Sequence, residues 1–204
     1  MPIVAKAEND KEFEKFPLPE AGTVQAVCAG VWDLGNQVST WDGIEKVQHK
    51  CVIAWELAQL IDAPENEYHG QPYMLSKRYT VSLYENSNLR KDLESWRGAP
   101  FDAATIASGF DIETLYGVNC LLGVAHESGR KDPSKTYANV TAILKLPKGM
   151  EAMKPVRAKD EAPPKWVLEL QAQAVEPVPV GADADDEPDF MKAGPDEGDA
   201  LSIY

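Results

Sequence analysis

Cysteine and histidine are scarce in this sequence, which argues against a disulfide scaffold or a metal site. Its 204 residues include three cysteines and three histidines. Cys28, Cys51 and Cys120 each lie within an apolar run, and no C-x-x-C motif is present. Structural zinc sites usually use such pairs, and secreted disulfide frameworks use an even number of cysteines. We therefore expect three buried free thiols in a reducing cytoplasm, and neither a metal nor a cofactor.

The chain also lacks a long hydrophobic run. No segment reaches the roughly 18 consecutive apolar residues of a membrane-spanning helix. The first residues, MPIVAKAENDKEFEKF, are charged throughout and lack the apolar stretch that is typical of a signal peptide. The sequence therefore predicts a cytoplasmic protein without membrane contact.

Familiar catalytic motifs are missing as well. The sequence contains no P-loop, no G-x-S-x-G nucleophile motif and no H-E-x-x-H zinc motif. Carboxylates such as Asp33, Asp42 and Glu56 do not form a closely spaced acidic motif. His126 could act as a lone base, but a histidine at a strand end more often has a structural role. We therefore expect a binding protein rather than an enzyme.

Basic residues are outnumbered, and the imbalance is concentrated at one end of the chain. There are 20 Lys+Arg against 33 Asp+Glu, a net charge of −13. Residues 1–150 hold 15 basic and 20 acidic residues, whereas residues 151–204 hold 5 and 13. A uniformly basic nucleic-acid binder is excluded. A patterned one is not, because residues 71–148 hold 10 basic and 8 acidic residues.

Composition divides the chain into three parts. Residues 1–21 are mostly polar and include the run FPLPE, so we expect an N-terminal arm. Residues 22–150 carry the patterns of a folded domain. Residues 151–204 are rich in Pro, Asp and Glu and contain one short helical pattern, WVLELQAQAV. Such a segment buries too little to offset its ordering entropy, so we expect a linker and a mostly disordered acidic tail.

Alternation of apolar and polar residues predicts five strands in the folded domain. They are expected at about residues 22–34, 46–57, 73–84, 119–126 and 137–146. Residues 35–44 between the first two strands are interpreted as a polar loop. Residues 127–136, between the last two strands, are a second connection.

One helix is predicted between the third and fourth strands. Leu89, Leu93 and Trp96 recur there at helical spacing, with Asn86 or Ser87 as a start signal and a glycine after the last turn. A short helical turn is expected in DIETLYG, residues 111–117.

This element order is that of the OB-fold, a five-stranded Greek-key barrel. The predicted fold class is therefore mainly β, an OB-fold-like barrel with one helix between strands 3 and 4. A β-sandwich also contains several short strands, but the single helix favours the OB-fold. In an OB-fold the face of strands 2 and 3, with the 1–2 and 4–5 loops, binds oligonucleotides or oligosaccharides.

Aromatic and cationic side chains cluster in three places around the expected binding face. Single-stranded nucleic acid needs rings on which bases stack, each stack contributing roughly 1–3 kcal/mol, and cations along its phosphates. The predicted nucleic-acid-binding residues are Trp41, Lys46 and Lys50; Lys77, Arg78, Tyr79 and Tyr84; and Arg130, Lys131, Lys135 and Tyr137.

Each of these residues also has a structural interpretation. Lys77 and Tyr79 alternate with apolar residues, so Arg78 and Tyr84 are the better candidates on the third strand. The cations of residues 127–136 have the alternative role of keeping a surface loop soluble. Trp55 and Trp96 are expected in the core, and the role of Trp32 stays open.

The runs VCAGVWDLG, YMLSKRYTVSLYENSNLRKDLESWRG and YANVTAILKLPKG together resemble a family of small phage and prophage proteins. Members look like OB-fold single-stranded DNA-binding proteins, and the resemblance covers most of residues 16–150. It implies a phage origin, a place in the host cytoplasm and sequence-independent binding of single-stranded DNA alongside replication or recombination proteins. It does not identify contact residues.

The acidic end contains the run DADDEPDF, residues 183–190, which resembles the C-terminal tip of bacterial and phage single-stranded DNA-binding proteins. That resemblance implies recruitment of replication or repair enzymes, with the acids attracted to a basic pocket and the phenylalanine as an apolar anchor. The predicted partner-binding residues are Asp185, Asp186, Glu187, Asp189 and Phe190. Here the phenylalanine is not terminal, and an acidic solubilising tail is the alternative.

Two other functions stay open. A protein-interaction or structural module fits the net charge of −13, which repels DNA at long range. An OB-fold domain for an oligosaccharide or small ligand would need a Trp-lined pocket without adjacent cations. The sequence leaves open whether the chain forms a homo-oligomer, and whether it prefers DNA or RNA.

Overall fold

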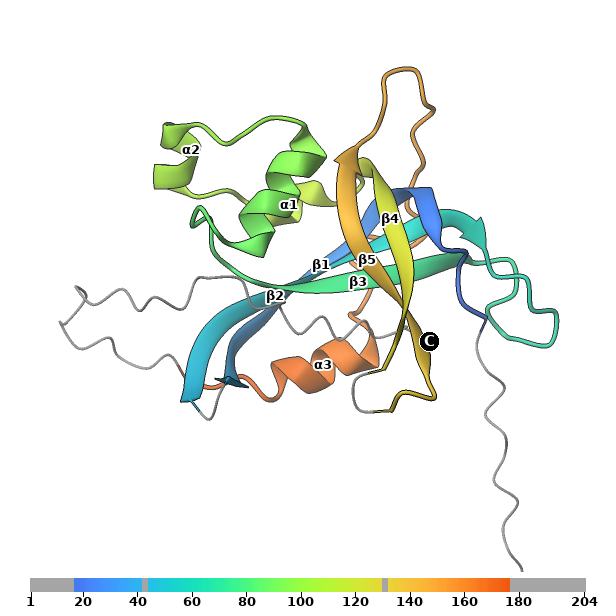
Figure 1. The fold of residues 1–204 in the computed structure, drawn as a ribbon, viewed down its shortest axis with the longest axis horizontal. Coiled ribbons are helices and arrows are strands. Elements are labelled where there is room, and N and C mark those ends of the chain that lie inside the picture. Colours follow the sequence, from blue (N-terminus) through green and yellow to red (C-terminus); the bar gives the residue numbers. More distant parts are fainter. Residues whose placement is uncertain (1–16, 42–43, 130–131, 177–204) are drawn as a thin grey trace, which may run out of the picture.

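The computed structural model describes residues 17–41, 44–129 and 132–176, and its strands form a single antiparallel sheet (Figure 1). The strands are β1 (Gly22–Trp41), β2 (Ile44–Leu60), β3 (Pro72–Thr80), β4 (Asn119–Ser128) and β5 (Thr136–Lys145). The helices are α1 (Asn88–Arg97), α2 (Ala103–Ser108) and α3 (Lys165–Gln171), with a 3₁₀ turn, η1 (Ile112–Leu115). The expectation of a mainly β fold with five strands is confirmed. Most of the expected N-terminal arm lies outside the described residues.

The sheet has the order β3-β2-β1-β4-β5 and is open. Its edge strands, β3 and β5, approach each other within 8 Å between Cα atoms, but no ladder joins them in the described part of the chain. Helix α1 lies between the two edges. Lys77 of β3 forms an ion pair with Asp92 of α1, and Ser95 of α1 donates a hydrogen bond to the carbonyl of Ile143 in β5. The sheet is thus bridged by a helix where a closed barrel would have a fifth ladder.

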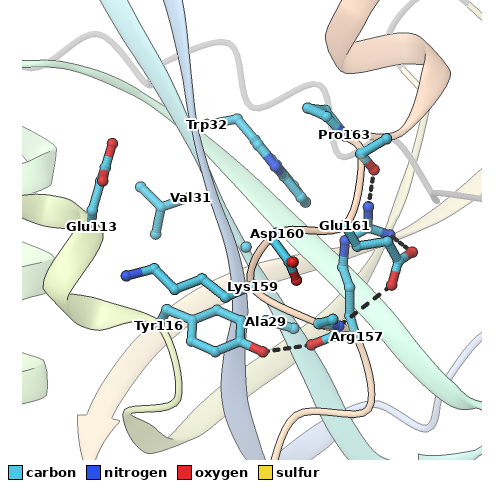
Figure 2. Close-up of a pocket in the computed structure, with 13 residues that line it drawn as sticks. Ala29, Val31, Trp32, Glu113, Tyr116, Arg157, Lys159, Asp160, Glu161 and Pro163 are labelled. Carbon is cyan, nitrogen blue, oxygen red and sulfur yellow. Dashed lines mark hydrogen bonds and ion pairs between the residues drawn. The ribbon is translucent and has the colours of Figure 1, made fainter.

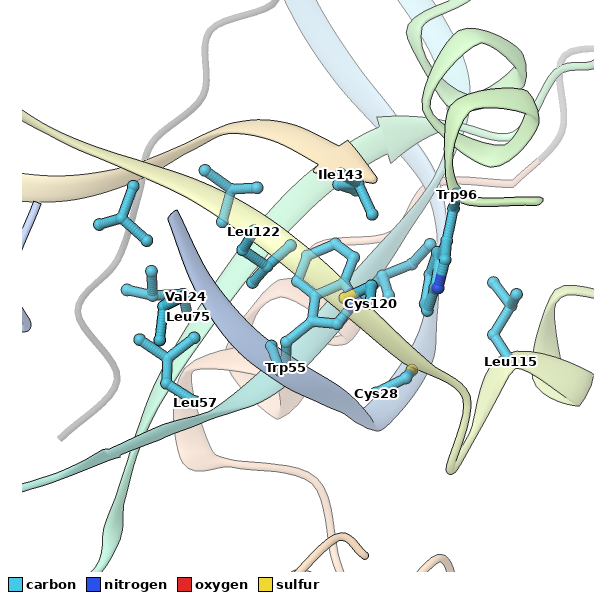
Figure 3. Close-up of a cluster of buried hydrophobic side chains, with 14 of the residues drawn as sticks. Val24, Cys28, Trp55, Leu57, Leu75, Trp96, Leu115, Cys120, Leu122 and Ile143 are labelled. Carbon is cyan, nitrogen blue, oxygen red and sulfur yellow. The ribbon is translucent and has the colours of Figure 1, made fainter. Parts of the chain in front are cut away.

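The main core lies on the concave side of the sheet, beneath α1 (Figure 3). The rings of Trp55 and Trp96 meet there with centroids 5.8 Å apart. Both tryptophans are buried, as the sequence predicted. Cys28, Cys51 and Cys120 are buried free thiols, which is also as predicted.

Helix α1 forms where the sequence predicted it. Ser87 accepts a hydrogen bond from the backbone N–H of Arg90, and Gly98 ends the helix with a φ of 70°. The expectation of one helix before β4 was incomplete, because α2 follows. The side chain of Asp102 caps α2 by accepting from the backbone N–H of Thr105.

The expected polar loop between the first two strands is itself β-structure. Pairing continues from Gly35↔Lys50 to Trp41↔Ile44, after an irregularity in the ladder between Asp33 and Gly35. The neighbouring strand β3 does not extend alongside this part of β2, since it pairs with β2 only as far as Lys50. We call this two-stranded extension, residues 35–41 and 44–50, the ribbon.

The folded part of the chain extends well beyond residue 150, where the sequence predicted a linker and tail. Residues 151–176, which we call the C-terminal strap, run over the sheet and include α3. Val167 of α3 is fully buried against Leu34 and Val52. The strap is ordered because the sheet supplies its partners: Asn119 bonds the backbone of Met153, and Val175 pairs with β1.

Candidate nucleic-acid interface

The outer face of the sheet, opposite the main core, carries one aromatic, one aliphatic and one cationic residue in a line across three strands. Trp32 of β1 pairs with Val52 of β2, and Val52 pairs with Arg78 of β3. Directly paired residues in an antiparallel sheet share a face. Trp32 and Val52 pack in a small cluster separate from the main core, which fixes the side on which all three lie. We call Trp32, Val52 and Arg78 the outer-face row.

Two lysines predicted as contacts continue this face towards the ribbon. Lys50 pairs with Thr80 and Lys46 pairs with Ser39, and alternation along β2 places both lysines on the side of Val52. Lys50 and Arg78 are partly exposed, and neither has an ion-pair partner in the described part of the chain. Unpaired cations on a common face are available to phosphates.

Lys77 and Tyr79, also predicted as contacts, lie on the opposite side and hold α1 in place. The Nζ of Lys77 is 2.7 Å from Oδ2 of Asp92, and the hydroxyl of Tyr79 donates to the same oxygen at 2.8 Å. The ammonium of Lys77 also lies 5.4 Å from the centre of the Tyr79 ring. Because Tyr79 is only 1% exposed, it offers no ring for stacking. Their assignment to the binding face is therefore corrected.

The remaining predicted residues are not gathered with the outer-face row. Tyr84 is exposed and lies between β3 and α1, Lys135 is exposed near Asp132, and Tyr137 is half-buried at the start of β5. The ribbon and the β4–β5 connection lie on opposite sides of α3 in Figure 1. Outside the described residues, or with an undescribed side chain, are Trp41, Arg130, Lys131, Asp185, Asp186, Glu187, Asp189 and Phe190.

The C-terminal strap lies directly on the outer-face row. The guanidinium of Arg157 is 5.5 Å from the centre of the Trp32 ring, and Val167 covers Val52. Arg157 also pairs with Glu161 at 2.8 Å. No local pattern singles out Arg157, because its partner ring lies more than a hundred residues away along the chain.

A hollow of about 290 Å³ opens between the strap, β1 and η1 (Figure 2). Trp32, Tyr116, Arg157 and Lys159 line it together with three acidic residues, Glu113, Asp160 and Glu161. The hydroxyl of Tyr116 donates to the carbonyl of Arg157 at 2.6 Å. Burial and the nearby carboxylates of Glu56, Asp160 and Glu161 raise the pKa of Tyr116, so the hydroxyl remains a donor.

The described residues contain no group of histidine, cysteine and acidic side chains arranged to hold a metal ion. Within the same residues, no helix is long and apolar enough to cross a membrane. Comparison with protein-family models and with curated proteins finds no match to this chain.

Proposed function

We propose that this protein binds single-stranded DNA without sequence preference on the outer face of β1, β2 and β3, as a non-catalytic component of phage replication or recombination. The observation that carries the proposal is the outer-face row with Lys50 beside it. It combines a ring, an aliphatic surface and unpaired cations. Those are the components of a sequence-tolerant single-strand site.

The strand order supports an OB-fold-like Greek key. In a Greek key three consecutive strands are neighbours and a fourth returns beside the first, in the order 4-1-2-3. Here β1, β2 and β3 are neighbours and β4 returns beside β1. An OB-fold uses the face of its second and third strands for oligonucleotides, and the cations Lys50 and Arg78 lie on those strands.

Each side chain of the face has a separate task in this proposal. A base stacks on the indole of Trp32, and the guanidinium of Arg78 binds a phosphate with two parallel N–H donors. Lys50 and Lys46 continue the positive potential along β2 into the ribbon. The acidic tail, with Phe190 as its apolar anchor, contacts replication or recombination proteins.

Fluorescence anisotropy with labelled oligo-dT tests the proposal. Affinity should fall as salt rises, because cations that neutralise phosphates release counterions. Arg78→Met and Lys50→Met should each weaken binding several-fold and lower the salt slope by about 1. Lys91→Met on α1 removes the same charge from an exposed site and is the matched control. Salt-independent binding, or wild-type affinity in both variants, would refute the proposed face.

A second candidate function is a protein-interaction module, and the ribbon favours it. Val38 and Val47 pair directly on the ribbon and are 48% and 39% exposed. Exposed valines on a projecting strand pair are typical of protein-contacting surfaces. Recovery of a protein partner together with no retention on single-stranded DNA cellulose would favour this function over the first.

A further inference from the structure

The C-terminal strap occupies the surface on which the proposed function places nucleic acid. Val167 packs on Val52, the central residue of the outer-face row, and buries it. Arg157 lies over the ring of Trp32, where a stacked base would otherwise lie. Only Arg78 of the row is free of strap contacts that the structure records. Nucleic acid and the seated strap therefore cannot both use the whole row.

We propose that the strap is a displaceable cover, which single-stranded DNA must lift to reach Trp32 and Val52. This inference rests on the proposed function, since it concerns the same face. A cover that competes with the ligand lowers the apparent affinity by the fraction of molecules in which the site is open. The strap then sets how tightly the protein binds DNA.

Helix α3 is held only weakly on the sheet. The helix has seven residues, and Pro164 at its start offers no side-chain cap. Val167 is its buried residue, and the indole N–H of Trp166 is buried without an acceptor in the described part of the chain. Short, poorly capped helices with an unsatisfied donor belong to the least stable units of a fold.

Other contacts return the strap to its place when no ligand is present. The carboxylate of Glu56 holds the backbone N–H groups of Val156 and Arg157. The side chain of Gln171 donates to the carbonyl of Asp33, and the N–H of Val175 donates to that of Asn36. The last two bonds cap the edge of β1, which would otherwise be unpaired. The strap is thus held firmly near its start, by Asn119 and Glu56, and has a weaker end at α3.

Hydrogen exchange on the full chain, with and without saturating oligo-dT, measures displacement directly. The reporters are the amides of Val167 and Val175, which bond to Pro164 and Asn36 in the seated strap. We expect their exchange to accelerate when DNA binds, while amides in the core strands remain protected. Unchanged or slower exchange at these amides in a saturated complex would overturn the inference and leave the proposed function standing. Absence of any binding would instead refute the proposed function.

A pair of substitutions on α3 tests the same point by affinity. Val167→Asp should unseat the helix and tighten oligo-dT binding by about tenfold, despite the added negative charge. Leu168→Asp adds the same charge at the neighbouring position, which is 48% exposed, and should not tighten binding. Equal affinity of the two variants would contradict the inference. Circular dichroism confirms that each remains folded, and the exchange experiment decides the question if Val167→Asp does not fold.

Discussion

The side-chain carboxylate of Glu56 in β2 accepts a hydrogen bond from the backbone N–H of Arg157, 2.8 Å away and 101 residues later in the chain. It also accepts the N–H of Val156 at 2.6 Å. Glu56 is only 2% exposed. A buried carboxylate is unfavourable unless donors replace its water, and the strap supplies two. This residue therefore joins the sheet to a segment in which the sequence predicts only one short helix.

Glu56→Gln should lower the free energy of unfolding by about 1–3 kcal/mol, because the new amide places a donor against one of the two N–H groups. Urea unfolding followed by tryptophan fluorescence measures the change. Glu45→Gln makes the same change at an exposed position of the ribbon and should leave stability nearly unaltered. Equal unfolding midpoints for the two variants would contradict the anchoring role of Glu56.

Asp92 is the shared acceptor that ties β3 to α1. Asp92→Ala leaves the half-buried ammonium of Lys77 and the hydroxyl of Tyr79 without their carboxylate, and should destabilise the fold by about 1–3 kcal/mol. The loss should be smaller in a Lys77→Met background, where no charge is stranded, and a double-mutant cycle measures the difference. Oligo-dT affinity of the folded variant should match the wild type, since these residues do not lie on the outer face. A large loss of affinity would reverse that assignment.

Local patterns predicted the central elements because their signals are contained within a few residues. Alternation in β2 predicted that Trp55 lies in the core, and the structure places it there. Alternation in β3 predicted that Lys77 and Arg78 lie on opposite faces of the sheet, and the structure places them so. Ser87 and the glycine after α1 bounded that helix correctly, since caps depend on adjacent backbone groups.

The outer face could not be predicted in the same way, because its composition depends on residues distant in sequence. The strap has prolines and charges that suggest a linker, and it is ordered through acceptors such as Glu56 that belong to the sheet. Arg157 meets Trp32 only once β1 is in place. The ribbon, in contrast, had a local signal. Asp42 and Gly43 form the dipeptide typical of a two-residue hairpin, and this favours pairing on both sides of it.

Stability should fall steeply in alkaline solution, because the three buried thiols resist ionisation in the folded state. Burial raises the pKa of Cys28 and of Cys51 to about 12, from an ordinary value of 9.0, and it also raises the pKa of Cys120. A raised pKa means that the stabilisation is complete below pH 9.0. It is lost as the pH rises towards 12, since only the unfolded chain then releases the protons.

Each thiol should contribute a loss of about 1.4 kcal/mol per pH unit within that interval. Urea unfolding between pH 8 and pH 11 measures it, because this range begins below the ordinary cysteine pKa of 9.0 and ends below the raised values. Cys51→Ala lowers stability at neutral pH by removing a buried side chain. The free energy of unfolding of this variant should fall less steeply with pH, because one thiol fewer contributes to the loss. Parallel curves for the wild type and the variant would show that Cys51 ionises equally in both states.

The indole of Trp32 lies so close to Gly30 that no other residue fits there without moving the ring. A Cβ at Gly30 would lie 2.3 Å from the Cζ2 and Cη2 atoms of Trp32. Gly30→Ala should therefore destabilise the protein by about 1–3 kcal/mol and shift the ring against Arg157. In a Trp32→Ala background the added methyl meets no ring, so the same substitution should have a small effect. Thermal unfolding of the four proteins yields the coupling energy, and a coupling near zero would mean that the ring does not rest on Gly30.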